Sequence, residues 1–320
     1  MTTPAPPAEG TRTPWADLPA PVRAAVAELL GAPVTHAVTQ PGGFSPGVAA
    51  RLRTAAGHRA FVKAVGAHTN PDSPGLHRAE ARNAAALPPT VPAPRLLGTY
   101  DDGTWVALVF EEVPGRQPRI PWREPELRRV LDAVAHLSRA LTPAPLPAPS
   151  AAESLTGSFA GWERLTAPEA EDRRDRLDPW TRERLPALAA LAADWPRATA
   201  GDTLAHGDLR ADNILLTPDD RVVFVDWPHV VRAAPWFDLL VMLPCVRAQG
   251  GPEPEELFGA HPCGRDADPD AVTVALAALA GYFVEASLRP SPPGLPTLRA
   301  FQRAQGEAAL AWLRGRWRRS

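Results

Sequence analysis

The sequence predicts an α+β protein with two lobes, a smaller β-rich lobe followed by a larger helical one. Two observations lead to this prediction. Extended patterns gather in the first third of the 320 residues, and apolar residues at helical spacing dominate the remainder. Proline clusters separate the segments, because proline lacks a backbone donor and restricts the residue before it. We expect residues 1–14 to be disordered, 15–110 to form the first lobe, 111–116 to be the hinge and 117–320 to form the second lobe.

Short extended segments identify the first lobe. Val48–Arg53 and Arg59–Val65 flank a glycine-containing turn, which is typical of a hairpin. A helix is expected over His77–Leu87, and a further strand over Trp105–Phe110. The first lobe should therefore be a small sheet with a helix packed on it.

Helical patterns fill the second lobe. Leucine and valine recur at steps of three and four from Leu127 to Leu141, the spacing of one helical face. Further helices are expected over Pro179–Trp195, Trp236–Val246, Ala271–Leu288 and Leu298–Trp317. The clear β signal in this half is a hairpin formed by Asn213–Leu216 and Arg221–Val225.

Composition limits the classes of function. The 34 basic and 36 acidic residues leave a formal net charge of −2, so no overall cationic field favours nucleic acid or anionic lipid. Two cysteines are too few for a secreted disulfide framework, and reduced thiols are the simpler interpretation. The longest apolar run, from Asp270 to Glu285, has about 14 residues between its ends, fewer than the roughly 18 needed to cross a bilayer. The first residues lack the order of a signal peptide. We expect a cytoplasmic protein with no nucleic-acid, membrane or obligate protein partner.

The most specific feature is the string His-Gly-Asp-Leu-Arg-Ala-Asp-Asn at positions 206–213. It is followed by an apolar strand that ends in Asp226, thirteen residues after Asn213. Phosphoryl transfer from a nucleotide needs an aspartate to orient the attacking hydroxyl and accept its proton, and oxygen ligands for magnesium. Asp208 suits the first role, and Asn213 and Asp226 suit the second. Each residue alone is common in loops, but the ordered string with its hairpin is not.

This string resembles the catalytic loop of the aminoglycoside phosphotransferase and choline kinase superfamily, the small-molecule relatives of protein kinases. The resemblance implies a protein-kinase-like fold, ATP and Mg²⁺ as cofactors, and a small hydroxyl-bearing substrate. It implies Asp208 as the catalytic base and Asn213 and Asp226 as magnesium ligands. His206 is expected to orient the loop, because Asp208 already fills the role of base. Asp238 resembles a family aspartate at a helix start that braces the same loop.

Lys63 and Glu80, upstream of this string, occur in the order in which protein kinases carry their conserved lysine and glutamate. Lys63 lies on an apolar strand, from which a cation could reach the α- and β-phosphates of a nucleotide. A lone lysine on a strand is more often exposed to solvent, but the order of motifs favours the functional interpretation. Glu80, on the helix expected seventeen residues later, is the carboxylate predicted to pair with Lys63.

Two loops are expected to complete the nucleotide site. Gly42, Gly43 and Ser45 lie between expected strands, where backbone amides could approach phosphate. The pattern departs from the Gly-x-Gly-x-x-Gly loop of protein kinases, so an empty hairpin turn remains an alternative. Glu111 and Val113 lie in a run that resembles the family's hinge, whose backbone would bind adenine.

Two alternatives remain beside the small-molecule phosphotransferase. A protein kinase shares the same parts, but eleven residues between Asp226 and Asp238 leave little room for an activation segment, and no Ala-Pro-Glu follows. A silent, nucleotide-binding pseudokinase would be expected to lack one of the key polar residues. Lys63, Asp208, Asn213 and Asp226 are all present.

The sequence does not identify the acceptor. Acidic residues in the 150–178 segment would suit a polyamine such as an aminoglycoside, or an amino alcohol. They are Glu153, Glu163, Glu169, Glu171, Asp172, Asp175 and Asp178. Arginines interleave with them, so a solvated, salt-bridged helix face is the preferred interpretation. Trp162 and Trp180 are expected to form either a wall of the substrate pocket or part of the core.

Overall fold

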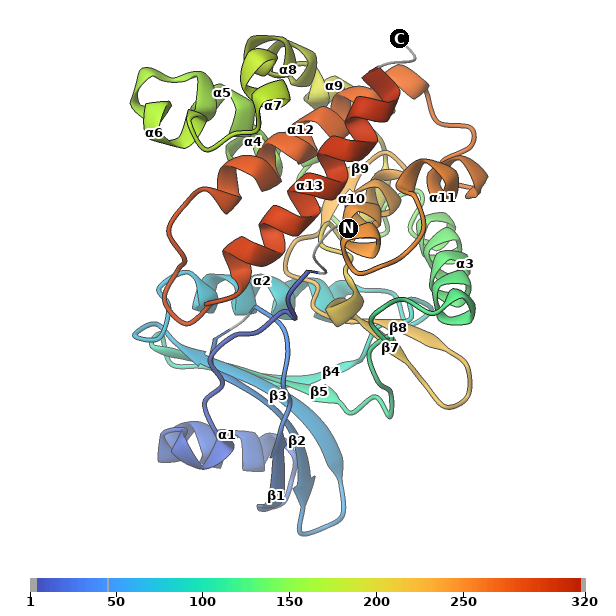
Figure 1. Cartoon of the computed structure of the whole chain (residues 1–320). Helices are drawn as coiled ribbons and strands as arrows, with labels where there is room; N and C mark the ends of the chain where they lie inside the picture. The colour runs from blue at the N-terminus through green and yellow to red at the C-terminus, as the bar shows by residue number, and fades with distance from the viewer. Residues whose placement is uncertain (1–4, 45, 318–320) are drawn as a thin grey trace.

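A computed structural model describes residues 5–44 and 46–317, and it has the two expected lobes (Figure 1). The first lobe is an antiparallel sheet with strand order β1-β2-β3-β5-β4. Its strands are β1 (Val34–Thr39), β2 (Val48–Thr54), β3 (Arg59–Gly66), β4 (Leu96–Asp101) and β5 (Trp105–Glu111). Helices α1 (Ala20–Leu29) and α2 (Ser73–Ala86) cover its two faces.

Alternation along β5 explains why this sheet is buried on both sides. Successive strand residues point to opposite faces, so Ala107 and Val109 pack with α1, while Val106, Leu108 and Phe110 lie on the α2 side. Burial on both faces produces the uninterrupted apolar run that was visible in the sequence. The same alternation on β3 places Lys63 on the face that α2 covers.

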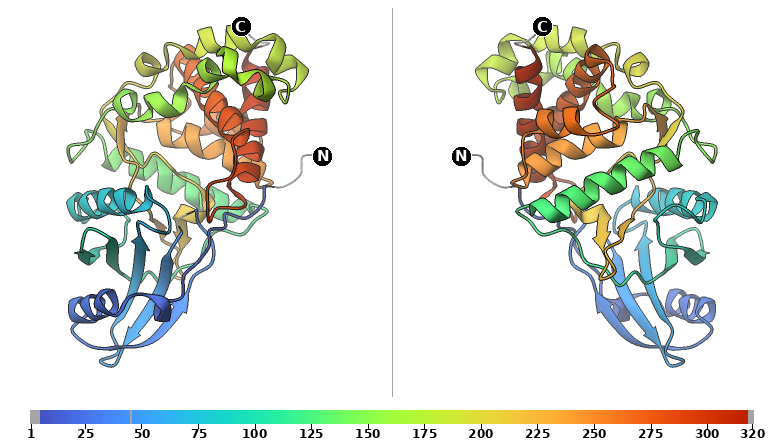
Figure 2. Two further views of the ribbon diagram at one scale, coloured as in Figure 1. Left: turned by 90° about the vertical axis from the view of Figure 1, so that its left-hand side faces the viewer. Right: turned by 90° about the vertical axis from the view of Figure 1, so that its right-hand side faces the viewer.

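The second lobe is helical, and Figure 2 shows it stacked on the sheet lobe. Its helices are α3 (Glu124–Ala140), α4 (Ala151–Phe159), α5 (Gly161–Thr166), α6 (Glu171–Arg174), α7 (Pro179–Glu183), α8 (Leu185–Ala192), α9 (Trp195–Ala198), α10 (Phe237–Ala248), α11 (Pro254–Ala260), α12 (Pro269–Ser287) and α13 (Leu298–Trp317). Two short antiparallel pairs join β6 (Thr203–Ala205) to β9 (Val231–Ala233), and β7 (Ile214–Leu216) to β8 (Val222–Phe224). These pairs hold the functional loops.

Most predicted elements are present, and the differences have local causes. The single helix expected over Pro179–Trp195 is divided into α7 and α8, and its last residue begins α9. Pro186 lies in the first turn of α8, where its missing N–H is tolerated, whereas it would interrupt a continuous helix. Helix α1 was not predicted, because it begins inside a proline cluster read as loop, with Pro21 in its first turn.

The expected disorder of residues 1–14 is wrong for residues 5–14, which we call the N-terminal strap; residues 1–4 lie outside the described residues. The backbone amides of Ala5 and Thr11 donate to carbonyls of the helical lobe, at Ala248 (3.0 Å) and Gly294 (2.8 Å). The amide of Thr13 donates to Gly47 of the sheet lobe at 3.0 Å. These bonds satisfy backbone groups that an unfolded segment would expose to water. The strap therefore connects the two lobes.

Helix α12 is the buried apolar helix expected from the sequence. By length and composition it could cross a membrane, with a mean hydropathy of 1.3 in its best window, but 72% of that window is buried. It packs against α13 on one side and against α5, α8 and α9 on another. Such burial is what the central helix of a folded lobe requires.

Candidate active site

Lys63 joins two carboxylates from different parts of the chain. Its Nζ lies 2.9 and 2.8 Å from the two carboxylate oxygens of Glu80 on α2, and 2.6 Å from Oδ1 of Asp226. All three side chains are largely buried. The structure thus brings together the lysine and glutamate paired in the sequence analysis, and adds Asp226 to the same cluster.

The charges in this cluster depend on one another. Burial lowers the pKa of Lys63, but attraction to Asp226 and Glu80 outweighs it, so the pKa lies above its ordinary value. Burial raises the pKa of Asp226, but Lys63 outweighs it, and the net shift is downward. For Glu80 burial dominates and raises the pKa to about 7, against the opposing effect of Lys63. Lys63 is the cation that makes two buried carboxylates tolerable.

Asp238 and His206 hold the catalytic-loop string in place. Asp238, in the first turn of α10, accepts hydrogen bonds from the backbone amides of His206 (2.8 Å) and Gly207 (2.9 Å). The fully buried His206 ring has Nε2 3.0 Å from the carbonyl of Val225 and Nδ1 3.3 Å from the amide of Asp208. These partners fit a neutral ring that donates from Nε2 and accepts at Nδ1. Burial lowers the pKa of His206 to about 4, which also favours the neutral form.

Gly207 permits the turn that presents Asp208. Its φ of +79° lies in the left-handed region, and a Cβ there would come within 2.3 Å of the carbonyl oxygen of His229. Six residues after Gly207, Asn213 fixes the loop from its other end. Asn213 donates from Nδ2 to the backbone carbonyl of Asp208 at 2.8 Å. Asp226 also has a positive φ, of 71°, just after β8.

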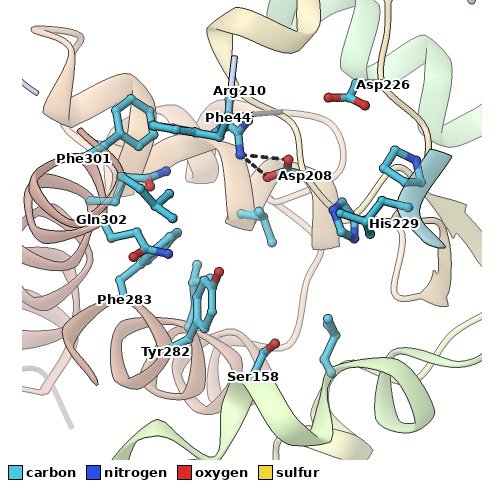
Figure 3. A pocket seen from close by; sticks show the side chains of 18 of the residues that line it. Phe44, Ser158, Asp208, Arg210, Asp226, His229, Tyr282, Phe283, Phe301 and Gln302 are labelled. Carbon is cyan, nitrogen blue, oxygen red and sulfur yellow. Dashed lines mark hydrogen bonds and ion pairs between the residues drawn. The ribbon is translucent and has the colours of Figure 1, made fainter. Parts of the chain in front are cut away.

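Arg210 contacts Asp208 directly and was not among the predicted site residues. Its Nη1 lies 2.7 and 2.8 Å from the two carboxylate oxygens of Asp208 (Figure 3). Its other nitrogens bind the carboxylate of Asp212. The guanidinium also lies over the rings of Phe44 and Phe301, 5.5 and 6.0 Å from their centroids. The arginine was visible within the string at positions 206–213, but its contacts with two remote phenylalanines were not.

One cavity of about 350 Å³ lies between the sheet and the helical lobe. The predicted residues Gly42, Gly43, Glu111 and Val113 line it, together with Lys63, Glu80, Asn213 and Asp226. Ser45 lies outside the described residues. Glu112, next to the predicted Glu111, also lines this cavity and pairs with Arg51 and Arg59.

The N-terminal strap contributes a cation to this cavity. Arg12 lines it and donates a hydrogen bond to the carbonyl of Gly42. Burial lowers the pKa of Arg12, while Asp226 and Asp212 oppose that shift. No sequence signal marked Arg12, because it lies in a proline-rich segment far along the chain from every motif.

A second cavity of about 260 Å³ opens on the other side of the same carboxylates (Figure 3). Asp208 and Arg210 line it, along with residues of α4, α12 and α13. His77, Glu80 and Asp226 line both cavities. The two spaces therefore meet at Asp226, and Asp208 lies on the side of the second one.

Comparison with known proteins relates this arrangement to a family. Residues 41–275 match the phosphotransferase enzyme family. Over 132 residues the chain is 33% identical to an aminoglycoside 3'-phosphotransferase of Streptomyces fradiae, a match that covers 40% of this chain and 48% of that protein. It is 32% identical to the enzyme of the same name from Streptomyces ribosidificus, with 40% and 49% covered. The chain thus spans about half the length of the curated relatives it matches.

Solved structures with low sequence identity share the fold. A thermostable mutant of the aminoglycoside phosphotransferase APH(4)-Ia, in a ternary complex with ADP and hygromycin B, is 15% identical with a TM-score of 0.60, covering 92% of this chain and 98% of that one. The choline kinase LicA from Streptococcus pneumoniae is 13% identical with a TM-score of 0.58, covering 91% and 98%. The two-lobed α+β architecture expected from the sequence is confirmed as the fold of these small-molecule kinases.

Proposed function

The chain belongs to the phosphotransferase enzyme family, and from that membership and the geometry of its site we propose that it transfers the γ-phosphoryl group of ATP to a hydroxyl of a small molecule in a magnesium-dependent reaction. The observation that carries the proposal is the meeting of two cavities at Asp226, with Lys63 on one side and Asp208 on the other. Phosphoryl transfer requires such a junction, because donor and acceptor must approach in line.

The first cavity is assigned to the nucleotide. Lys63 would contact the α- and β-phosphates, with Glu80 holding its ammonium group in position. Amides of the Gly42-Gly43 turn and the guanidinium of Arg12 lie along the same cavity and would add positive charge near the phosphates. Backbone groups of Glu111 and Val113, just after β5, would bind the adenine.

Asn213 and Asp226 are suited to hold magnesium. Magnesium in nucleotide sites is held by one or two protein oxygens together with phosphates and water. The amide nitrogen of Asn213 is engaged with the carbonyl of Asp208, which leaves its Oδ1 for a metal. Among the described residues no group of three or more His, Cys, Asp or Glu could hold a metal without such additional ligands. A magnesium ion bound there would neutralise charge on the phosphates during transfer.

Asp208 is proposed as the catalytic base. Burial raises its pKa, which favours uptake of a proton from the acceptor hydroxyl, while the charge of Arg210 opposes that rise. Asn213 and Asp238 fix the position of the loop through hydrogen bonds to its backbone. The neutral ring of His206 holds the loop to the carbonyl of Val225. Most of the rate enhancement would come from positioning and from fixed charges.

The test is formation of ADP by purified protein with ATP and a panel of hydroxyl-bearing acceptors, with and without magnesium. Asp226→Asn should remove most of the magnesium-dependent turnover. Asp219→Asn is a matched control, because Asp219 is an exposed carboxylate that pairs with Arg221 outside both cavities. Equal turnover by the two variants would refute the assignment of Asp226, and turnover independent of magnesium would refute the proposed cofactor.

A further inference from the structure

Each carboxylate that lines the cavity beyond Asp208, among the described residues, already has a cationic side chain as a partner. Its acidic lining residues are Glu80, Asp208 and Asp226. Lys63 binds Glu80 and Asp226, and Arg210 binds both oxygens of Asp208. The acids that border this cavity are therefore already paired with cations of the protein.

The acidic segment considered in the sequence analysis does not reach this cavity. Of residues 150–178, only Leu155, Ser158 and Phe159 line it. Glu153 forms the capping box of α4, and Asp178 caps α7 and binds Arg314. The positions of Glu153 and Asp178 agree with the interpretation that the acids of this segment are structural and surface groups. The tryptophans also lie elsewhere: Trp162 is buried in the core, and Trp180 packs against Trp317.

Apolar and aromatic side chains form most of the remaining wall. They come from α2, α4, α10, α12 and α13 and from neighbouring loops. They are Phe44, Leu76, Leu155, Phe159, Pro228, Phe237, Val241, Leu279, Phe283, Leu298 and Phe301. His77 also lines the cavity, and burial lowers its pKa to about 4, so that its ring is neutral near pH 7. An acceptor here meets apolar surface over slightly more than half of the wall, and Arg210 and His229 also line the cavity.

A few neutral polar groups interrupt this apolar wall. Figure 3 shows Ser158, Tyr282 and Gln302 around the space below Asp208, on the side away from Asp226. Gln305, one helical turn from Gln302, also lines the cavity and is only 3% exposed. In the part of the chain that the structure describes, its side-chain amide has no hydrogen-bond partner. A buried amide of this kind is well placed to bind a neutral polar group of a ligand.

We infer that the acceptor is an uncharged, compact alcohol with an apolar ring body, held by a hydrogen bond to Gln305 beside Tyr282 and Gln302, and that it is not a polyamine. The inference rests on the proposed function, since it takes the hydroxyl presented to Asp208 as the one that is phosphorylated. A polyamine would lose its hydration in this cavity without gaining carboxylate partners. An apolar ring would instead replace water along aromatic walls, with few polar contacts to fix its orientation.

Measuring the affinity for acceptors tests this inference without requiring phosphoryl transfer. Protein saturated with the ATP analogue AMP-PNP and magnesium is titrated calorimetrically with neutral aryl alcohols such as phenyl β-D-glucoside and 2-phenylethanol. Each is paired with its aminomethyl counterpart, which differs by one positive charge, and kanamycin and choline complete the set. We expect at least one neutral alcohol to bind at least 10-fold more tightly than its charged counterpart, kanamycin or choline. Tighter binding of the charged compounds, or no binding by any neutral alcohol, would overturn the inference.

Two variants of Gln305 test the basis of the selectivity. Gln305→Leu should weaken binding of the preferred neutral alcohol about 10-fold, because an apolar side chain of similar size cannot replace the amide. Gln305→Glu should move the preference toward the aminomethyl compounds by supplying the missing carboxylate. Unchanged affinities in both variants would contradict the role of Gln305. ATP affinity, measured in parallel, should stay unchanged in both.

The same samples distinguish failure of this inference from failure of the proposed function. Phosphorylated product is followed by ³¹P NMR after ATP replaces the analogue. Binding of neutral alcohols without any phosphorylated product would leave the acceptor chemistry supported and count against the phosphotransferase proposal. Product formed most rapidly from kanamycin or choline would support the phosphotransferase and overturn the inference on the acceptor.

Discussion

Replacing Lys63 by methionine should destabilise the protein in a way that depends on pH. The ammonium group contacts three carboxylate oxygens at 2.6 to 2.9 Å, and the carboxylate of Glu80 is almost completely buried. Methionine keeps most of the volume of the side chain but removes the charge. Two buried carboxylates would then face each other without a cation, and Glu80 would retain its proton to a higher pH than in the parent protein.

The sign and size follow from the pKa of Glu80. In the parent protein burial raises it to about 7, above its ordinary value, and without Lys63 it would rise further. When the pKa of a carboxyl is higher in the folded than in the unfolded state, the group stabilises the fold fully below its unfolded-state pKa. That contribution is lost as the pH rises to its folded-state pKa. Above pH 7 only the variant still loses stability, by about 1.4 kcal/mol for each pH unit. The free energy of unfolding of Lys63→Met should therefore fall further below that of the parent protein by about 2 kcal/mol between pH 7 and pH 8.5. The difference would approach the roughly 3–5 kcal/mol expected when one partner of a buried ion pair is removed.

Chemical denaturation followed by tryptophan fluorescence, at pH 6, 7 and 8.5, measures this deficit. The matched control is the double variant Lys63→Met/Glu80→Gln, which also removes the carboxyl that has lost its partner. The double variant should be more stable than the single variant at pH 8.5 and should show less dependence on pH. A deficit that is constant across this range, or a double variant less stable than the single one, would refute the reasoning.

Three further predictions concern residues around the cluster. Asp238→Ala should lower the free energy of unfolding by about 2–5 kcal/mol, because it leaves the buried amides of His206 and Gly207 without an acceptor. Asp238→Asn keeps one acceptor and should lower it by about half as much. Equal losses in denaturation experiments would contradict this account. Arg12→Gln should raise the KM for ATP about 10-fold with little change in KM for the acceptor, and an unchanged KM for ATP would remove Arg12 from the nucleotide site. The pKa of His206 is lowered from 6.5 to about 4, so its contribution to stability is complete above pH 6.5 and is lost as the pH falls toward 4. Over this range the free energy of unfolding should fall by about 3 kcal/mol more in the parent protein than in His206→Gln. Parallel pH profiles would show that the ring is not held neutral.

Local patterns were enough to predict the β2–β3 and β7–β8 hairpins and the positions of α2, α10, α12 and α13. In each case the signal is carried by residues that are neighbours in the chain, such as the alternation along β3 or the turn after Leu216. The string at positions 206–213 also predicted a loop whose residues Asp208 and Asn213 line the two cavities, because its spacing is specific. The partner of Lys63 at Glu80 was predicted from the order of motifs rather than from any contact visible in the sequence.

Features that depend on contacts between distant segments were missed. Arg12 reaches the cavity that we propose for the nucleotide because the strap bonds to Gly294 and Gly47, each more than 30 residues from Arg12. The contact of Arg210 with the rings of Phe44 and Phe301 joins three widely separated segments. Likewise, the pairing of each acid in the second cavity with a lysine or arginine is not visible from composition.

Transfer in a single turnover by Asp208→Asn tests the central claim most directly. Asparagine keeps the shape of the side chain but cannot accept the proton, and a positioned general base contributes roughly 10²–10⁴-fold to a rate. With an acceptor that the parent protein phosphorylates, we predict that phosphorylated product forms about 10³-fold more slowly while the Kd for ATP changes by less than about 2-fold, because Asp208 lies outside the nucleotide cavity. Transfer at the parental rate would contradict the account.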